Sequence, residues 1–218
     1  YVHPVEPLQG VQVRCLSPHG LSVCAALAPM IAVAPGRAFL VLTGPCGLSA
    51  LASRHSGDVA VQVDPEDLPD RCEGYDGVDW VILRGAEWAA DPLRLEALTR
   101  WLEGGGRLAV SGAEALRALA ASPLGKRLGV SLREPVGVPS IHPLQALAGD
   151  DLGLPSQGTL CERIACRNAQ TLAASEGIPL IQRTGLGDRE ILLFALDPEV
   201  FRCQPGYWGL WARTLDLP

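Results

Sequence analysis

Short, nearly uninterrupted apolar runs, separated by helical or loop segments, constrain the fold of this chain more than any other feature. Runs of this kind stand at 38–42 (AFLVL), 59–63 (VAVQV), 78–83 (VDWVIL) and 107–110 (RLAV). A continuous apolar run is typical of a strand that is covered on both faces of a sheet. Strands that alternate with helices or loops predict a parallel sheet joined by right-handed crossovers.

The segments between these strands carry helix signals. A helix over 93–103 is predicted to start at the Asp91-Pro92 cap, with its leucines three and four apart on one face, and to stop at Gly104. A second amphipathic helix is expected over 113–121, and a short helix over 46–55.

The C-terminal part reads differently. The segment 124–168 is rich in Gly and Pro and predicts no clear elements, but strands are expected to begin near Thr171, Pro179 and Glu190. A glycine-rich turn at 185–188 separates the last two, which predicts an antiparallel hairpin.

A closing helix is expected over 207–215. It carries Trp208 and Trp211, and we favour packing on the sheet for both over a place at a membrane interface.

The composition narrows the class of protein. The chain has 218 residues, of which 48% are hydrophobic and 19% charged, with a formal net charge of −6. A sizeable core is therefore expected, whereas a nucleic-acid or anionic-membrane surface is not. There is no apolar run long enough to span a bilayer. No leader is recognisable, and we expect the chain to be a piece of a longer protein.

The histidine and cysteine patterns bear on metal binding and on disulfides. No C-x-x-C occurs and the histidines are scattered, so no metal site is predicted; they are His3, His19, His55 and His142. Seven cysteines are many for a cytosolic protein. The pairs Cys15–Cys24 and Cys161–Cys166 are the predicted disulfides if the compartment is oxidising. Burial of most cysteines as small apolar residues is an equally good interpretation.

The order of four segments is specific enough to suggest a family: GRAFLVL from Gly36, YDGVDWVIL from Tyr75, LEALTRWLEGGGRLAVSG from Leu95 and GLGDREILLFALDP from Gly185. It resembles the class I glutamine-amidotransferase-like (flavodoxin-like) domain of uncharacterised bacterial membrane proteins. The resemblance implies an α/β three-layer sandwich with a mostly parallel sheet and antiparallel C-terminal strands over 36–218. Residues 1–35 would be a short N-terminal β segment, either the tail of a preceding β domain or edge strands.

The resemblance also implies where catalysis would occur. An amidotransferase holds a cysteine on the strand-to-helix turn and a histidine at a later strand end. Here the turn contains Ser111 and Gly112, and the later strand end reads Asp197-Pro198-Glu199, so both catalytic groups are missing. The weaker catalytic candidates are Cys46, Ser111 and Glu114, and Glu114 is better explained as a helix-start charge.

If the domain binds anything, the carboxyl ends of the parallel strands are the expected rim. Its residues would include Thr43, Asp64, Arg84, Glu87, Trp88 and Ser111. The leading hypothesis is a non-catalytic extracytoplasmic domain without a cofactor, which binds a protein partner or the rest of its own membrane-anchored chain. The alternatives are a hydrolase or amidotransferase-related enzyme that uses Cys46 or Ser111, and a cytoplasmic thiol-based sensor.

Overall fold

The computed structural model describes residues 11–16, 22–28, 38–42, 58–138, 140–153, 160–186 and 189–216, the first three of these ranges as backbone only. The strands are β1 (Val11–Leu16), β2 (Ser22–Ala28), β3 (Ala38–Leu42), β4 (Val59–Val63), β5 (Trp80–Leu83), β6 (Arg107–Ser111), β7 (Ser131–Gly137), β8 (Leu160–Ala165), β9 (Gln170–Ser175), β10 (Ile178–Leu186) and β11 (Arg189–Phe194).

The α-helices are α2 (Pro92–Gly104), α3 (Ala113–Ala121), α4 (Pro123–Leu128), α5 (His142–Ala148) and α6 (Tyr207–Thr214). Short 3-10 helices are η1 (Pro65–Asp67), η2 (Cys72–Tyr75), η3 (Glu87–Ala89) and η4 (Pro198–Phe201). The predicted helix over 46–55 lies outside the described residues.

A seven-stranded mixed sheet forms the centre of the fold, in the order β4-β3-β5-β6-β11-β10-β9. The five strands from β4 to β11 run parallel, whereas β10 is antiparallel to both of its neighbours. The predicted α/β class and the antiparallel C-terminal hairpin are therefore confirmed. In the hairpin, Gly185 stands opposite Glu190 and Leu186 opposite Arg189.

Two smaller sheets accompany the large one. β1 pairs with β2, and β7 pairs with β8, each antiparallel. The β1–β2 pair adds no strand to the large sheet. The division of the chain at residue 35 stays a prediction. The segment 124–168, which the sequence left without predicted elements, contributes α4, β7, α5 and β8.

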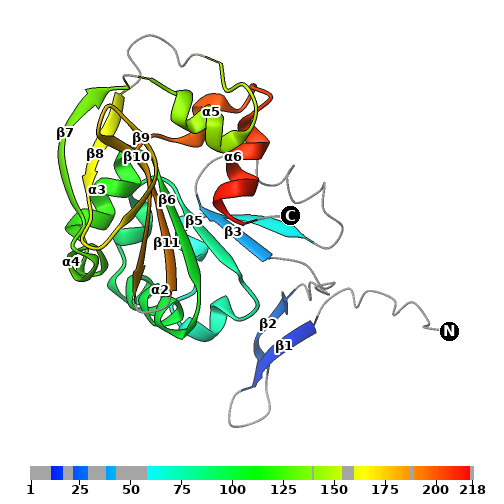
Figure 1. Cartoon of the computed structure of the whole chain (residues 1–218). Coiled ribbons are helices and arrows are strands. Elements are labelled where there is room, and N and C mark those ends of the chain that lie inside the picture. The colour runs from blue at the N-terminus through cyan, green and yellow to red at the C-terminus, as the bar shows by residue number, and fades with distance from the viewer. Residues whose placement is uncertain are drawn as a thin grey trace.

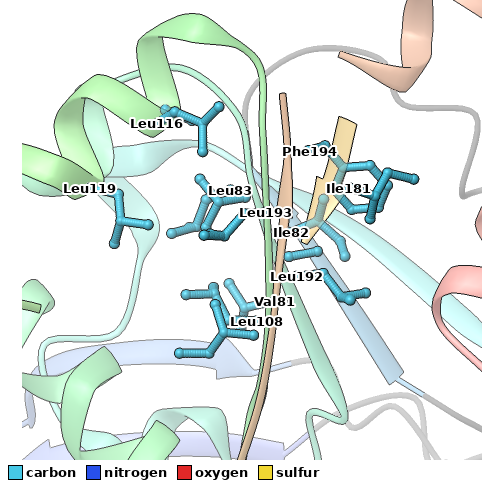
Figure 2. Packing of buried hydrophobic residues seen from close by; sticks show 14 of the residues in the cluster. Val81, Ile82, Leu83, Leu108, Leu116, Leu119, Ile181, Leu192, Leu193 and Phe194 are labelled. Atoms are coloured by element: carbon cyan, nitrogen blue, oxygen red, sulfur yellow. The ribbon is translucent and has the colours of Figure 1, made fainter. Parts of the chain in front are cut away.

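Apolar side chains pack on both faces of the large sheet. Figure 2 shows Leu83 and Leu193 on the face that α3 covers, with Leu116 and Leu119 of that helix, and Ile82 and Phe194 on the other face. All six are buried. Successive strand residues point to opposite faces, so strands that are apolar at every position bury both faces. Figure 1 shows α5 and α6 lying together on the side away from α3 and α4.

The start of α2 follows its sequence signals. The Asp91 carboxylate accepts a hydrogen bond from the backbone N–H of Leu93 at 2.9 Å, and Pro92 occupies the first turn. The helix continues through Gly104, and the next residue, Gly105, caps it with a φ of 131°. The end of this helix therefore falls one residue later than predicted.

Tyr75 provides a test of the core beneath α2. Its ring is fully buried, with its centroid 5.4 Å from that of Trp101, and burial raises its pKa to about 12. The folded state thus holds the phenol proton more tightly than the unfolded chain does. The contribution of Tyr75 to the free energy of unfolding is therefore fully present below the unfolded pKa of about 10, and it is lost as the pH rises towards 12. Between neutral pH and about pH 11, the free energy of unfolding measured with urea should fall less for Tyr75→Phe than for the wild type. Equal losses in both proteins would contradict this assignment.

Candidate functional site

The carboxyl ends of β5, β6 and β11 meet at one edge of the sheet, with β6 in the middle. The turn that follows β6 is the strand-to-helix turn singled out in the sequence. Gly112 caps α3 there with a φ of 86°, a conformation that L side chains rarely adopt. No side chain caps the N-terminus of α3.

An ion pair crosses this turn. Arg84 directly follows β5, Asp197 lies three residues beyond the end of β11, and the Arg84 Nη2 donates to Asp197 Oδ2 at 2.5 Å. Their side chains are only 16% and 28% exposed. A pair that is partly withdrawn from water is screened less than a surface pair, so it holds the two strand ends together more firmly.

Asp197 is fixed by a second contact. Its Oδ1 accepts a hydrogen bond from the backbone N–H of Glu199 at 3.1 Å, which caps η4. A Cβ built on Gly112 would lie 3.7 Å from the Asp197 Cβ and 3.9 Å from its Oδ2. The carboxylate therefore lies against the turn itself, where an amidotransferase would present its nucleophile to substrate.

Ser111 is not accessible at this turn. The residue is 1% exposed, and its buried hydroxyl oxygen has no hydrogen-bond partner among the described residues. A serine nucleophile needs a base within hydrogen-bonding reach. Glu114 is exposed in the first turn of α3. His142 is exposed at the start of α5, where its Nδ1 lies 2.9 Å from Gln145 Oε1.

The remaining rim residues are not equivalent. Asp64 and Glu87 are exposed, after β4 and in η3. Trp88 is 1% exposed, and its indole N–H donates to the Gly85 carbonyl at 3.1 Å. The ring therefore packs in the core, and a role for Trp88 in a binding rim stays a prediction. Thr43 and Cys46 lie outside the described residues.

The structure corrects one predicted disulfide. Cys161 and Cys166 are both free thiols. Cys161 lies in β8 and Cys166 directly follows it, and five residues of extended chain separate Cα atoms by about 16 Å, far beyond the reach of a disulfide. Burial raises the pKa of both thiols. They are therefore protonated and poorly reactive at neutral pH.

The backbone of β1 and β2 is compatible with the other predicted disulfide. Cys15 of β1 stands opposite Cys24 of β2 in the antiparallel register. Their side chains lie outside the described part of the structure, so this disulfide stays a prediction. Cys72 and Cys203 are free thiols too, and Cys203 is exposed.

A surface hollow lies at the opposite end of the sheet from the rim. It has a volume of about 450 Å³, and its lining includes Asp79 and Gly106, which precede β5 and β6, and Arg107, the first residue of β6. A second hollow of about 350 Å³ shares Cys72, Glu73 and Arg100 with it. Neither hollow can be predicted from the sequence, because their walls come from turns and from one flank of α2.

Two general features of the described residues bear on function. No group of three or more His, Cys, Asp or Glu residues among them is arranged to hold a metal ion. Within the same ranges, no helix combines the length and the apolar character that crossing a membrane requires. Trp211, in α6, is fully buried, which confirms that it packs in the core, and Trp208 is half-buried against the same core.

No family model matches the chain, and no curated protein matches it in sequence. Several solved structures share its fold. The cytoplasmic protein STM3548 from Salmonella typhimurium is 14% identical, with a TM-score of 0.59, over 83% of this chain and 98% of that protein. The cytoplasmic protein STM1381 from Salmonella typhimurium LT2 is 15% identical, with a TM-score of 0.58, over 82% of this chain and 98% of that protein.

An enzyme contains a similar unit. The match to a β-galactosidase from Bacillus circulans sp. alkalophilus covers 82% of this chain but 30% of the enzyme, with 16% identity and a TM-score of 0.51. At such identities these likenesses show a common fold and nothing about activity.

Proposed function

We propose that this chain is a non-catalytic domain of the class I glutamine-amidotransferase-like, flavodoxin-like type, which serves binding or assembly within a larger bacterial membrane protein. The order of its parallel strands supports the fold assignment. Numbered from β3 along the chain, the strands β4-β3-β5-β6-β11 follow the order 2-1-3-4-5 of flavodoxin-like sheets.

The Arg84–Asp197 ion pair is the observation that carries the proposal. Glutamine hydrolysis requires a thiolate nucleophile and an imidazole base above the turn after the fourth strand. At this turn the chain instead has a buried Ser111 hydroxyl beneath a guanidinium and a carboxylate that satisfy each other. A guanidinium remains protonated at any physiological pH, so it cannot serve as the base. These groups stabilise the strand ends, and among the described residues of this turn they leave no accessible nucleophile.

Placement outside the cytoplasm follows from the family resemblance, and the opposed Cys15 and Cys24 are compatible with it. The cytoplasmic alternative draws on the names of the two Salmonella proteins and on the free thiols of the described residues. Counting thiols in the denatured, unreduced chain separates the two. A disulfide between Cys15 and Cys24 favours export, whereas seven free thiols favour the cytoplasm.

Activity-based labelling tests the absence of catalysis. We expect a serine-reactive phosphonate to leave Ser111 unmodified, and a thiol probe to modify Cys46 no faster than it modifies the same residue in the urea-unfolded chain. The exposed Cys203 is the positive control for the thiol probe. Labelling of Ser111 that disappears in Ser111→Ala, or preferential labelling of Cys46 in the folded chain, would establish the enzyme alternative instead.

Removing the ion pair should also cost stability. Asp197→Ala takes the carboxylate away from the partly buried Arg84 guanidinium and removes the cap of η4, so we expect a loss of about 1–3 kcal/mol in the free energy of unfolding. Asp197→Asn keeps an oxygen that can accept a hydrogen bond from the backbone N–H of Glu199, so this variant should lose less stability. Urea denaturation of both variants measures this. Equal stabilities for the wild type and Asp197→Ala would show that the pair does not hold the rim.

A further inference from the structure

The β1–β2 ribbon places two cysteines directly opposite each other. Cys15 of β1 pairs with Cys24 of β2 in the antiparallel register. Directly opposed residues of antiparallel strands have Cα atoms about 4.5–5.5 Å apart. A disulfide requires Cα atoms about 4.4–6.8 Å apart. The backbone therefore holds this pair at bridging distance, in contrast to Cys161 and Cys166, which lie along a single extended segment.

The ribbon stands apart from the rest of the fold. It forms a two-stranded sheet of its own, separate from the seven-stranded sheet. Among the described elements, its two strands contact each other extensively and no other element to a similar degree. Figure 1 shows the ribbon away from the helices that cover the large sheet. An isolated two-stranded ribbon is only marginally stable in water, because it buries too little apolar surface to offset the chain entropy that is lost on folding.

The residues of the two strands do little to stabilise the ribbon. Three of the seven residues of β2 are alanine, a residue type that is depleted in strands. Arg14 stands opposite Ala25 and Gln12 opposite Leu27, so neither polar residue meets a polar or charged partner across the ribbon. Among the paired positions, only that of the two cysteines can link the strands covalently.

A disulfide at this position would change the balance between formed and open ribbon. Eight residues stand between Cys15 and Cys24 in the chain. Closing a ring of this size lowers the entropy of the open chain and raises the ratio of formed to open ribbon about a hundredfold. A ribbon of marginal stability is thereby shifted from a mixture of formed and open chains to one that is almost fully formed.

We infer that Cys15 and Cys24 are a redox switch for the β1–β2 ribbon, which is formed when the two cysteines are joined and opens when they are reduced. Joining them removes two electrons and two protons from the thiols. A low-molecular-weight disulfide such as oxidised glutathione accepts both. One cysteine thiolate attacks that disulfide and releases the first glutathione, and the other cysteine then displaces the second glutathione from the mixed disulfide. The inference goes beyond the proposed function, because it does not involve the turn after β6.

Hydrogen exchange of the whole chain in two redox states tests the switch. The purified chain is equilibrated with oxidised or with reduced glutathione, and mass spectrometry follows the backbone amides of β1 and β2. We expect these amides to exchange at least about tenfold more slowly in the oxidised state, because exchange follows the fraction of open ribbon. The amides of β5 and β6 should exchange at the same rate in both states, since the ribbon adds no strand to the large sheet.

Cysteine variants separate the bridge from other effects of oxidation. Cys15→Ser with Cys24→Ser cannot form the bridge, so its ribbon amides should exchange in both states as fast as those of the reduced wild type. Cys203→Ser removes an exposed thiol outside the ribbon and should respond to oxidation like the wild type. If serine itself disturbs the chain, Cys15→Ala with Cys24→Ala replaces the double serine variant.

Equal protection of the ribbon in the oxidised and reduced wild type would overturn the inference. Free thiols or separate glutathione adducts at Cys15 and Cys24 after oxidation would also overturn it, as would a redox response that persists in the double serine variant. The proposed function has its own test. If exchange of the ribbon is independent of redox state while Ser111 and Cys46 remain unlabelled by the probes, the non-catalytic assignment stands and only the switch is wrong.

Discussion

Replacing Trp211 with alanine is expected to lower the free energy of unfolding by about 3–5 kcal/mol. The indole is fully buried in α6, and its centroid lies 5.2 Å from the Phe194 ring at the end of β11. Alanine would leave a large cavity between the last helix and the sheet, since the helix cannot collapse into the space without losing its other contacts. Urea denaturation followed by circular dichroism measures the loss.

Trp208→Ala provides the matched control on the same helix. Trp208 is half-buried and meets the Tyr207 ring edge-to-face at 4.7 Å, so its removal exposes little of the core. We expect it to cost clearly less than Trp211→Ala. If the two substitutions cost the same, α6 does not pack on the sheet through Trp211, and the interpretation of the C-terminal tryptophans as core residues fails.

Gly106→Ala should cost about 3 kcal/mol, at the upper end of the usual range for overpacking. A Cβ at this position would lie 2.3 Å from Trp101 Cδ2 and 2.4 Å from Cε2. The Trp101 ring packs against the Tyr75 ring, and Trp101 is only 9% exposed. The indole therefore cannot move aside freely. The substitution should shift the urea midpoint downward and also change the tryptophan fluorescence of the folded chain.

Gly104→Ala is the control within the same triple glycine. Nothing lies within 4 Å of a Cβ at Gly104, which is the last residue of α2. Alanine there should stabilise the chain by about 0.5–1 kcal/mol, because it restricts the unfolded chain more than glycine does. A destabilised Gly104→Ala, or a neutral Gly106→Ala, would show that close approach to Trp101 does not explain the glycine.

Local signals predicted the elements that depend on neighbouring residues. The apolar run at 59–63 coincides with β4, the Asp91-Pro92 cap starts α2, and β10 pairs antiparallel with β11 as the glycine-rich segment predicts. The elements of the segment 124–168 could not be predicted in this way, because β7 and β8 pair with each other although α5 lies between them in the chain. Their own sequences lack a strong alternation of apolar and polar residues, so the pairing between the strands defines them.

The position of the strand-to-helix turn could be predicted from the sequence, but the side chains that meet there could not. The predicted rim includes Ser111 and Arg84, and both lie at strand ends at that edge of the sheet, although Ser111 is buried. The partner of Arg84 is 113 residues away in the chain, so only the order of strands in the sheet brings the two together. From Asp197-Pro198 after the closing strand, the sequence predicts only that histidine is absent there. It does not identify Asp197 as the group that covers the turn.

The burial of Trp88 was not predictable for a related reason. Trp88 follows β5 as expected, but η3 turns its ring into the core. The pairing of Cys161 with Cys166 failed because the short spacing suggested a loop, whereas the intervening residues continue an extended strand. Side-chain direction is set by backbone conformation, which a spacing of residues does not specify.

The sequence alone therefore determined an α/β chain whose strand-to-helix turn lacks a thiol and whose later strand end lacks an imidazole, because residue identity is independent of folding. Tertiary structure decided that Asp197 and Arg84 cover that turn and that Arg133 faces Arg163. Each of these relations joins side chains from separate strands. Strand order and register arise from burying apolar surface over the whole sheet, so no local stretch of sequence contains them.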